Sequence, residues 1–213
     1  MLENLSGKDF KSQFKENKAL RLVTIFVGAI VVLVIGYFAY RTFVWTPNND
    51  KSKDAYWVGL NYASADSTDA AIAELTRAKK QFDGKQGGEL AQFVLARQLM
   101  AKGDFKKALE ELDGVKLNDT YLSIYKLGLQ GDCKSELKQY KEAKDMYVKA
   151  ANKNKNDKTT PEFLFKAGLV SEKLNDNKAA ADLYTQIKNE YPTFANQKAI
   201  DKYISRAKNK SNK

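Results

Sequence analysis

The sequence predicts an all-α protein in which a single N-terminal transmembrane helix precedes a solenoid of about four helical hairpins and a C-terminal capping helix. Three observations favour this fold class. An uncharged apolar run lies near the start of the chain, and small residues recur after it at intervals of 35–37 residues. Only 3 prolines occur in 213 residues, and the abundant Ala, Leu, Lys and Glu are good helix formers.

The apolar run LVTIFVGAIVVLVIGYFAY occupies residues 22–40 and carries no charge. Nineteen helical residues span about 28 Å, close to the roughly 30 Å hydrocarbon core of a bilayer. Arg41 can reach the interface, so the predicted span is 22–45. Its far end carries the aromatic residues of an interfacial belt, which are Tyr37, Tyr40 and Trp45. The length of the run and the lack of a small-x-small site after it predict a retained anchor that contacts the lipid bilayer.

Basic residues are denser before the span than after it. Those before it are Lys8, Lys11, Lys15, Lys18 and Arg21, and those after it are Arg41, Lys51 and Lys53. This bias predicts that residues 1–21 are a cytoplasmic basic segment and that the following domain lies on the other side of the membrane. Residues 5–18 fit a short amphipathic helix, which either contacts anionic lipid or a partner or serves only as a topology signal.

Polar residues 46–51 are expected to form a linker, residues 52–208 the repeat domain, and residues 209–213 a disordered basic tail.

Two columns of small residues predict where the paired helices of each hairpin approach closely. These repeat-packing residues are Gly59, Ala71, Ala96, Ala108, Gly131, Ala143, Gly168 and Ala180. Four residues after each alanine comes a leucine or tyrosine that we expect to pack into the next hairpin. The capping helix is predicted from Ile200, Tyr203, Ile204 and Ala207, which have helical spacing.

The units step by 37, 35 and 37 residues, near the 34 of a tetratricopeptide repeat (TPR). Gly168, Ala180, Tyr184 and Pro192, with Asn175-Asp176 at the turn, resemble such a repeat, which implies a TPR-like α-solenoid. The run Gly103–Ala150, together with the anchor, resembles the YfgM-like family, the ancillary subunit of the Sec translocon.

The YfgM-like resemblance implies a single-pass protein of the bacterial inner membrane with a periplasmic repeat domain. It also implies binding to the Sec translocon channel and to a periplasmic chaperone, a parvulin-like foldase, with a role in the export of secretory proteins. Two alternatives stay open: another envelope TPR protein that coordinates cell division or envelope assembly, and a TPR receptor that faces the cytosol.

The first helices of the hairpins should line a concave face that binds protein partners. The residues expected there are Tyr56, Leu60, Leu90, Phe93, Arg97, Met100, Tyr125, Asp132, Phe165 and Leu169. Because most of them are aromatic or aliphatic, we expect the face to prefer apolar or extended segments, or a partner's helix. Each of them taken singly is also compatible with packing between hairpins.

The composition argues against an enzyme. The chain has no histidine and one cysteine, so it lacks the commonest general base and any cysteine cluster for metal. Residues 84–88, GKQGG, lack the order of a phosphate-binding loop. We therefore expect no catalytic, cofactor or metal site, and no small-molecule substrate.

The formal charge of +10 is spread over the helical faces, so we expect no nucleic acid partner. Cys133 is expected to be a buried structural thiol.

Overall fold

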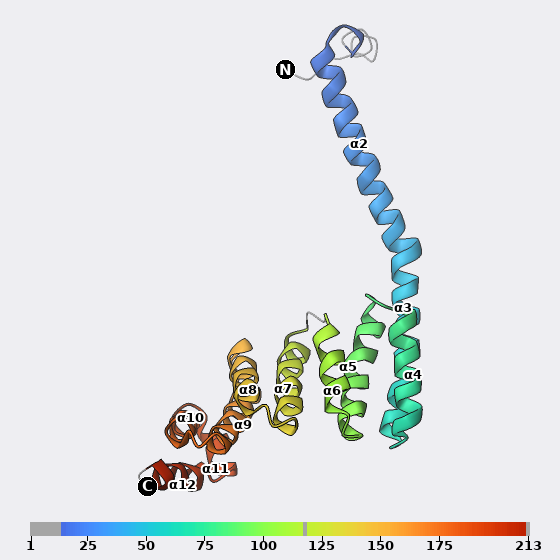
Figure 1. Cartoon of the computed structure of the whole chain (residues 1–213). Helices are drawn as coiled ribbons and strands as arrows, with labels where there is room; N and C mark the ends of the chain where they lie inside the picture. The colour runs from blue at the N-terminus through green and yellow to red at the C-terminus, as the bar shows by residue number, and fades with distance from the viewer. Residues whose placement is uncertain (1–13, 117–118, 212–213) are drawn as a thin grey trace. The chain divides into compact units, whose positions relative to one another are not determined.

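The computed structural model describes residues 14–116 and 119–211, and these residues form helices and turns without any strand (Figure 1). Residues 5–13 of the expected N-terminal helix lie outside this part of the chain. The protein divides into two compact units, residues 1–49 and residues 50–213. This division falls inside the segment 46–51 that was expected to be a linker.

The first unit contains the apolar helix α2 (Lys18–Tyr40) and the π-helical turn η1 (Arg41–Trp45). Asn17 caps α2, because its side-chain oxygen accepts hydrogen bonds from two first-turn backbone N–H groups at 3.0 and 3.2 Å. None of the α2 side chains is buried. Among the described residues one helix, Lys18–Ser64, is long and apolar enough to cross a membrane.

The π-turn ends at Trp45, two residues before Pro47. A proline inside a helix has no N–H to donate, and its ring crowds the carbonyl four residues earlier. Here the backbone N–H and the hydroxyl of Thr46 both point to the Arg41 carbonyl, with the hydroxyl donating at 2.9 Å. The wider turn accommodates the proline, so the predicted linker residues 46–51 are helical and begin α3 (Thr46–Ser64).

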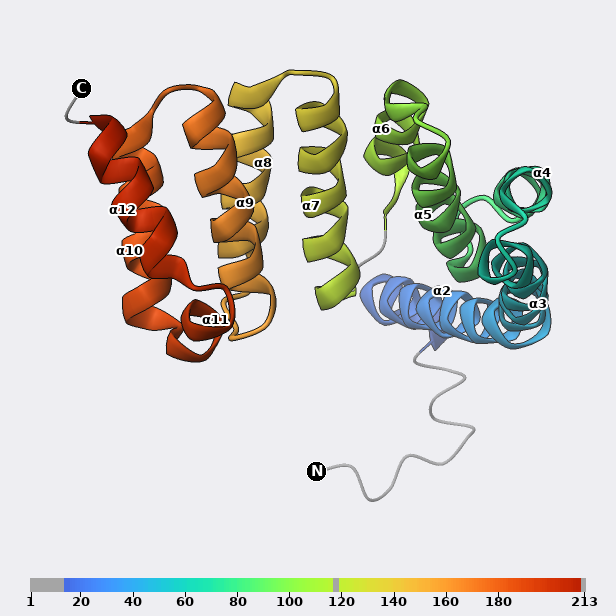
Figure 2. The same ribbon diagram turned by 90° about the horizontal axis from the view of Figure 1, so that it is seen from below.

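The second unit is a stack of helical hairpins followed by a cap (Figures 1 and 2). After α3 come α4 (Thr68–Gln81), α5 (Gln86–Ala101), α6 (Phe105–Gly114), α7 (Thr120–Glu136), α8 (Tyr140–Lys153), α9 (Thr159–Lys173), α10 (Asn177–Glu190), α11 (Pro192–Gln197) and α12 (Ile200–Ser211). From α4 onward sequential helices pack against each other, and α12 returns onto α10; Gly59 of α3 lies against Leu75 of α4. Residues 209–211, expected to be part of a disordered tail, belong to α12.

Each hairpin turns through one residue in the left-handed backbone region. These residues are Asp66 (φ 53°), Gly103 (φ 80°), Lys138 (φ 61°) and Asn175 (φ 59°). The residue that follows begins the second helix, and Asp104 and Asp176 accept a backbone hydrogen bond at this N-cap position. Only one of the four left-handed residues is glycine, so the others accept a backbone conformation that costs about 1–2 kcal/mol for an L-residue.

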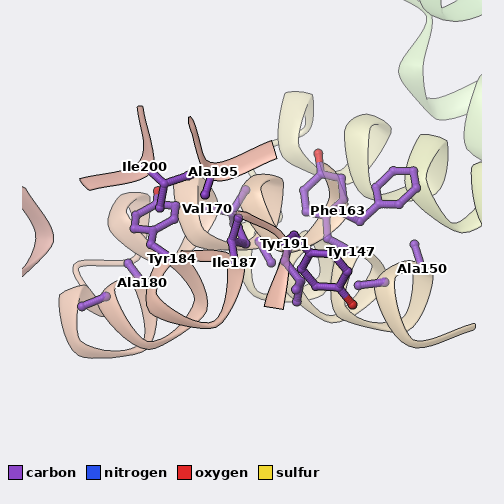
Figure 3. Close-up of a cluster of buried hydrophobic side chains, with 14 of the residues drawn as sticks. Tyr147, Ala150, Phe163, Val170, Ala180, Tyr184, Ile187, Tyr191, Ala195 and Ile200 are labelled. Atoms are coloured by element: carbon purple, nitrogen blue, oxygen red, sulfur yellow. The ribbon is translucent and has the colours of Figure 1, made fainter. Parts of the chain in front are cut away.

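All eight repeat-packing residues are buried. The partner of each glycine differs from the expectation, because the leucine or tyrosine packs within its own hairpin. A Cβ built on Gly131 would lie 2.6 Å from the Tyr147 ring, and one built on Gly168 would lie 2.4 Å from the Tyr184 ring. The small column therefore makes room for a large side chain of the paired helix. Figure 3 shows both tyrosines within the buried C-terminal cluster.

The capping helix α12 closes the C-terminal end of the solenoid. Its Ile200, Ile204 and Ala207 are buried against the preceding hairpin, as the sequence predicts. The Arg206 guanidinium donates two hydrogen bonds to the Glu172 carboxylate, at 2.9 and 2.6 Å, and the Tyr184 hydroxyl donates a third at 2.9 Å. This bidentate ion pair ties α12 to α9.

Candidate functional site

A groove of about 440 Å³ runs across the first helices of three consecutive hairpins, α5, α7 and α9. Its lining residues are Phe93, Arg97, Leu122, Tyr125, Gly128, Leu129, Asp132, Glu162, Phe163 and Lys166. First helices of stacked hairpins form the inner face of a solenoid of this type. The volume lies in the range of sites that enclose large side chains or small ligands.

The floor of the groove is aromatic and well packed. Phe93 is 7% exposed and Phe163 is 2% exposed. The ring of Tyr125 meets the ring of Phe163 edge to face, with centroids 6.0 Å apart. A Cβ on Gly128 would lie 2.1 Å from a Phe163 ring carbon, so the absence of a side chain at Gly128 allows this ring to lie against α7. The hollow is thus formed before any ligand arrives.

One side of the rim is a closed polar network. The Lys166 ammonium donates to both Asp132 carboxylate oxygens at 2.8 and 2.9 Å, and the Tyr147 hydroxyl donates to the same carboxylate at 2.7 Å. Burial and the neighbouring carboxylate raise the pKa of Tyr147, which keeps its hydroxyl a donor. Asp132 is therefore fully engaged within the protein and is better suited to holding the rim rigid than to binding a ligand.

Arg97 differs from Lys166 because it is exposed and belongs to none of the ion pairs found among the described residues. Its guanidinium stands beside the aromatic floor as an available cation with several donors. Glu162, on the opposite helix α9, is likewise in none of those pairs. A ligand that places an apolar side chain on the floor and a carboxylate at Arg97 would match this arrangement.

Four of the residues predicted for the concave face line the groove: Phe93, Arg97, Tyr125 and Asp132. The others lie elsewhere. Leu90 is half-buried, and Tyr56, Leu60 and Met100 are half-buried against the N-terminal core cluster. Phe165 packs edge to face on Tyr203 with centroids 4.8 Å apart. Leu169 lines a separate depression next to Arg206. The structure thus gathers part of the predicted set into one site and places the remainder in packing positions or a second depression.

Sequence reasoning missed six groove residues: Leu122, Gly128, Leu129, Glu162, Phe163 and Lys166. One signal could have revealed the hollow. Stepping by the repeat period from Tyr56 gives Phe93, then Gly128, then Phe165. Gly128 therefore interrupts a column of aromatic residues, and the missing ring leaves the space that Phe163 and the groove share.

Solved structures with a similar fold include two Rap proteins. The apo form of RapI is 18% identical, with a TM-score of 0.61, and the match covers 93% of this chain and 72% of that one. A Rap protein complexed with competence and sporulation factor is also 18% identical, with a TM-score of 0.55, and this chain spans 59% of its length. At this identity the likeness shows the fold. No curated protein matches the chain.

Two families match the sequence directly. Most of the hairpin made by α9 and α10 falls in a match to the family described as tetratricopeptide repeat, over residues 162–193. The family described as tetratricopeptide repeat-like domain matches residues 11–129, which is more than half of the chain and includes the apolar helix and the first two hairpins. The chain therefore belongs to the tetratricopeptide repeat-like domain family, whose helical repeats form scaffolds for protein–protein interaction.

Proposed function

We propose that this protein is a membrane-tethered scaffold that holds segments of partner proteins in the groove between α5, α7 and α9. The observation that carries the proposal is the preformed aromatic floor beside Arg97, which is in no ion pair within residues 14–116 and 119–211, on the first helices of a TPR-like stack. The apolar helix α2 supports the tether, because none of its side chains is buried and most of them are exposed.

The chemistry of the groove defines the segment it would take. Phe93, Tyr125 and Phe163 offer ring faces and edges to one large apolar side chain, and aromatic anchors of this kind dominate binding energy at interfaces. Arg97 offers a charge-assisted hydrogen bond to a nearby Asp or Glu of the same segment. The charges of Asp132 and Lys166 neutralise each other, so this pair contributes to the shape of the groove more than to its charge.

The partners we propose are the Sec translocon channel and a periplasmic parvulin-like foldase. Support comes from the anchor together with the run Gly103–Ala150, which resembles the YfgM-like family. The basic segment before the span supports a periplasmic location of the repeats in a bacterial inner membrane. A tether next to an export channel raises the local concentration of emerging chains, so weak contacts in the groove suffice to assist secretion.

Affinity purification of the full-length protein from gently solubilised membranes tests this proposal. We expect translocon channel subunits and a periplasmic foldase to be recovered. Recovery of neither, with the bait intact, would reject the proposed partners. Protease added outside spheroplasts should digest the repeat unit, and protection of that unit would reject the periplasmic location.

A pair of arginine variants tests the groove itself. Arg97→Ala removes the available cation and should lower partner affinity about ten-fold, the size of a lost charge-assisted hydrogen bond. Arg77→Ala is the matched control, because Arg77 is exposed on α4 and already pairs with Glu74 at 3.1 Å. Equal effects of the two substitutions would show that binding does not use the groove.

A further inference from the structure

A second cluster of side chains lies at the C-terminal end of the apolar helix, within the first unit. Tyr37, Tyr40, Arg41 and Trp45 surround a hollow of about 230 Å³. The Arg41 guanidinium donates a hydrogen bond to the Tyr37 hydroxyl at 3.2 Å and lies 5.9 Å from the centre of the Trp45 ring. The cation is thus held in place from both sides by aromatic residues.

The π-turn explains why these residues share one face. Four residues of α-helix overshoot a full turn by about 40°, so an unbroken α-helix would rotate Trp45 away from Tyr37. In η1 the bonds run from residue i to i+5, and four residues fall short of a full turn. The excess rotation from Tyr37 to Arg41 and the missing rotation from Arg41 to Trp45 nearly cancel. Tyr37 and Trp45 therefore lie on nearly the same face of the helix, one before Arg41 and one after it.

Arg41 has no acidic partner in any ion pair among the described residues. A guanidinium with free donors matches the oxygens of a phosphate. Tyr and Trp rings favour the headgroup level of a bilayer. The Arg41 guanidinium already lies over the Trp45 ring, and none of the four lining residues is a carboxylate. A second cation in the hollow would be repelled by Arg41, so a headgroup without an ammonium group fits better.

We propose that Tyr37, Tyr40, Arg41 and Trp45 form a binding site for the phosphate of an anionic phospholipid, with a headgroup that lacks an ammonium. This inference rests on the proposed membrane span. Arg41 binds the phosphate, and Tyr37 orients the guanidinium. The rings of Trp45 and Tyr40 contact the glycerol region. The anchor therefore selects its lipid neighbours at the C-terminal end of the span.

Fluorescence of Trp45 tests the site, because the chain has only 2 tryptophans and Trp57→Phe leaves Trp45 as the single reporter. Full-length Trp57→Phe protein is reconstituted in phosphatidylcholine vesicles that contain a minor fraction of acyl-brominated lipid. Brominated phosphatidylglycerol should quench Trp45 more than brominated phosphatidylcholine at the same mole fraction. The expected preference is about five-fold, the size of one Arg beside an anionic surface.

Three further variants in this background separate a site from diffuse charge. Arg41→Gln should reduce the preference to about one. Arg21→Gln, at the opposite end of the span, and Lys51→Gln, an exposed lysine outside the cluster, should preserve it. A loss with Lys51→Gln equal to that with Arg41→Gln would overturn the site. Added inorganic phosphate should not change the quenching preference for phosphatidylglycerol. If phosphate abolishes this preference, Arg41 binds a free anion instead of a lipid.

The remaining outcomes distinguish this inference from the proposed function. Equal quenching by both brominated lipids overturns the lipid site while leaving the span in the bilayer. An absence of quenching by either lipid shows that Trp45 does not reach the membrane, and then the span and the lipid site fail together.

Discussion

Gly128 is the residue on which the shape of the groove depends most directly, so Gly128→Ala is the sharpest perturbation. The new Cβ would lie 2.1 and 2.4 Å from two carbons of the Phe163 ring. Phe163 is 2% exposed and packed against Tyr125, so its ring has no empty space to enter. The ring must therefore be displaced, or α7 and α9 must separate.

The expected cost follows from two opposing terms. Overpacking a core by one methyl group typically costs about 1–3 kcal/mol, whereas replacing a helical glycine with alanine recovers about 1 kcal/mol. Because the new Cβ would lie 2.1 Å from a carbon of a buried ring, we expect the overpacking term in the upper half of its range, and the free energy of unfolding should then fall by about 1–2 kcal/mol. For a chain of this length that corresponds to a fall of roughly 3–6 °C in the melting midpoint.

Circular dichroism at 222 nm during heating of the full-length protein in mild detergent measures the change, since a detergent-bound α2 contributes a constant background. Gly114→Ala is the matched control. Its Cβ meets the amide end of Gln92, which donates a hydrogen bond to Glu111 at 3.0 Å. Losing that bond costs about 1 kcal/mol and replacing a helical glycine recovers about 1 kcal/mol, so the midpoint should stay close to that of the unchanged protein. A Gly128→Ala midpoint equal to or above that of the unchanged protein would refute the reasoning about the Phe163 ring.

Three further predictions concern the rest of the repeat unit. Lys138→Gly should raise the free energy of unfolding by about 0.5–1 kcal/mol in urea titrations, because Lys138 has φ 61° and glycine adopts this conformation without a Cβ clash; no gain would mean that the turn is unstrained. Burial opposes the ionisation of Glu172, but hydrogen bonds from Arg206 and Tyr184 outweigh it and hold the pKa of this carboxyl below its usual range. Since the folded pKa is the lower one, the carboxylate stabilises the fold above the unfolded pKa, and this contribution is lost as the pH falls through the folded pKa. The stability difference between the unchanged protein and Glu172→Gln should therefore be largest at neutral pH and vanish in acid, and a difference independent of pH would contradict the assignment. Burial raises the pKa of the Cys133 thiol to about 11, so a maleimide should label it slowly in the folded protein and rapidly in urea; rapid labelling of the folded protein would show that α7 opens locally.

The sequence predicts the fold class well because its signals are periodic and local. The apolar run at 22–40 requires only a count of uncharged residues. The recurring small residues follow from the stacking of similar hairpins, because each hairpin places the same sequence positions where its two helices approach most closely. Gly59, Gly131 and Gly168 recur for this reason, and each lies under a large side chain of its paired helix.

The groove is harder to predict because it depends on an exception to the repeat. Its hollow exists where Gly128 breaks the aromatic column and where Phe163, two residues before the next column position, fills part of the space. The sequence period identifies the packing positions that all hairpins share, whereas this groove depends on the aromatic side chain that one hairpin lacks at Gly128. The pairing of Asp132 with Lys166, 34 residues apart, likewise requires the geometry of adjacent hairpins.

The helical path through Pro47 could not be read from composition. The polar stretch 46–51 resembles a linker, and proline usually ends a helix. The outcome depends on the π-turn and on the Thr46 hydroxyl, which bonds to the Arg41 carbonyl five residues earlier at 2.9 Å. Such compensation involves a backbone geometry that residue preferences do not specify.

The central claim is that partner proteins occupy the groove, and site-specific photo-crosslinking tests it most directly. A photoreactive phenylalanine replaces Leu129, which lines the groove, or Lys149, an exposed residue of α8 that does not. After irradiation of intact cells, we expect crosslinks to the translocon channel or the foldase from position 129, and their loss when Arg97→Ala is added. Equal crosslinking from both positions, or crosslinks from position 149 alone, would contradict the claim.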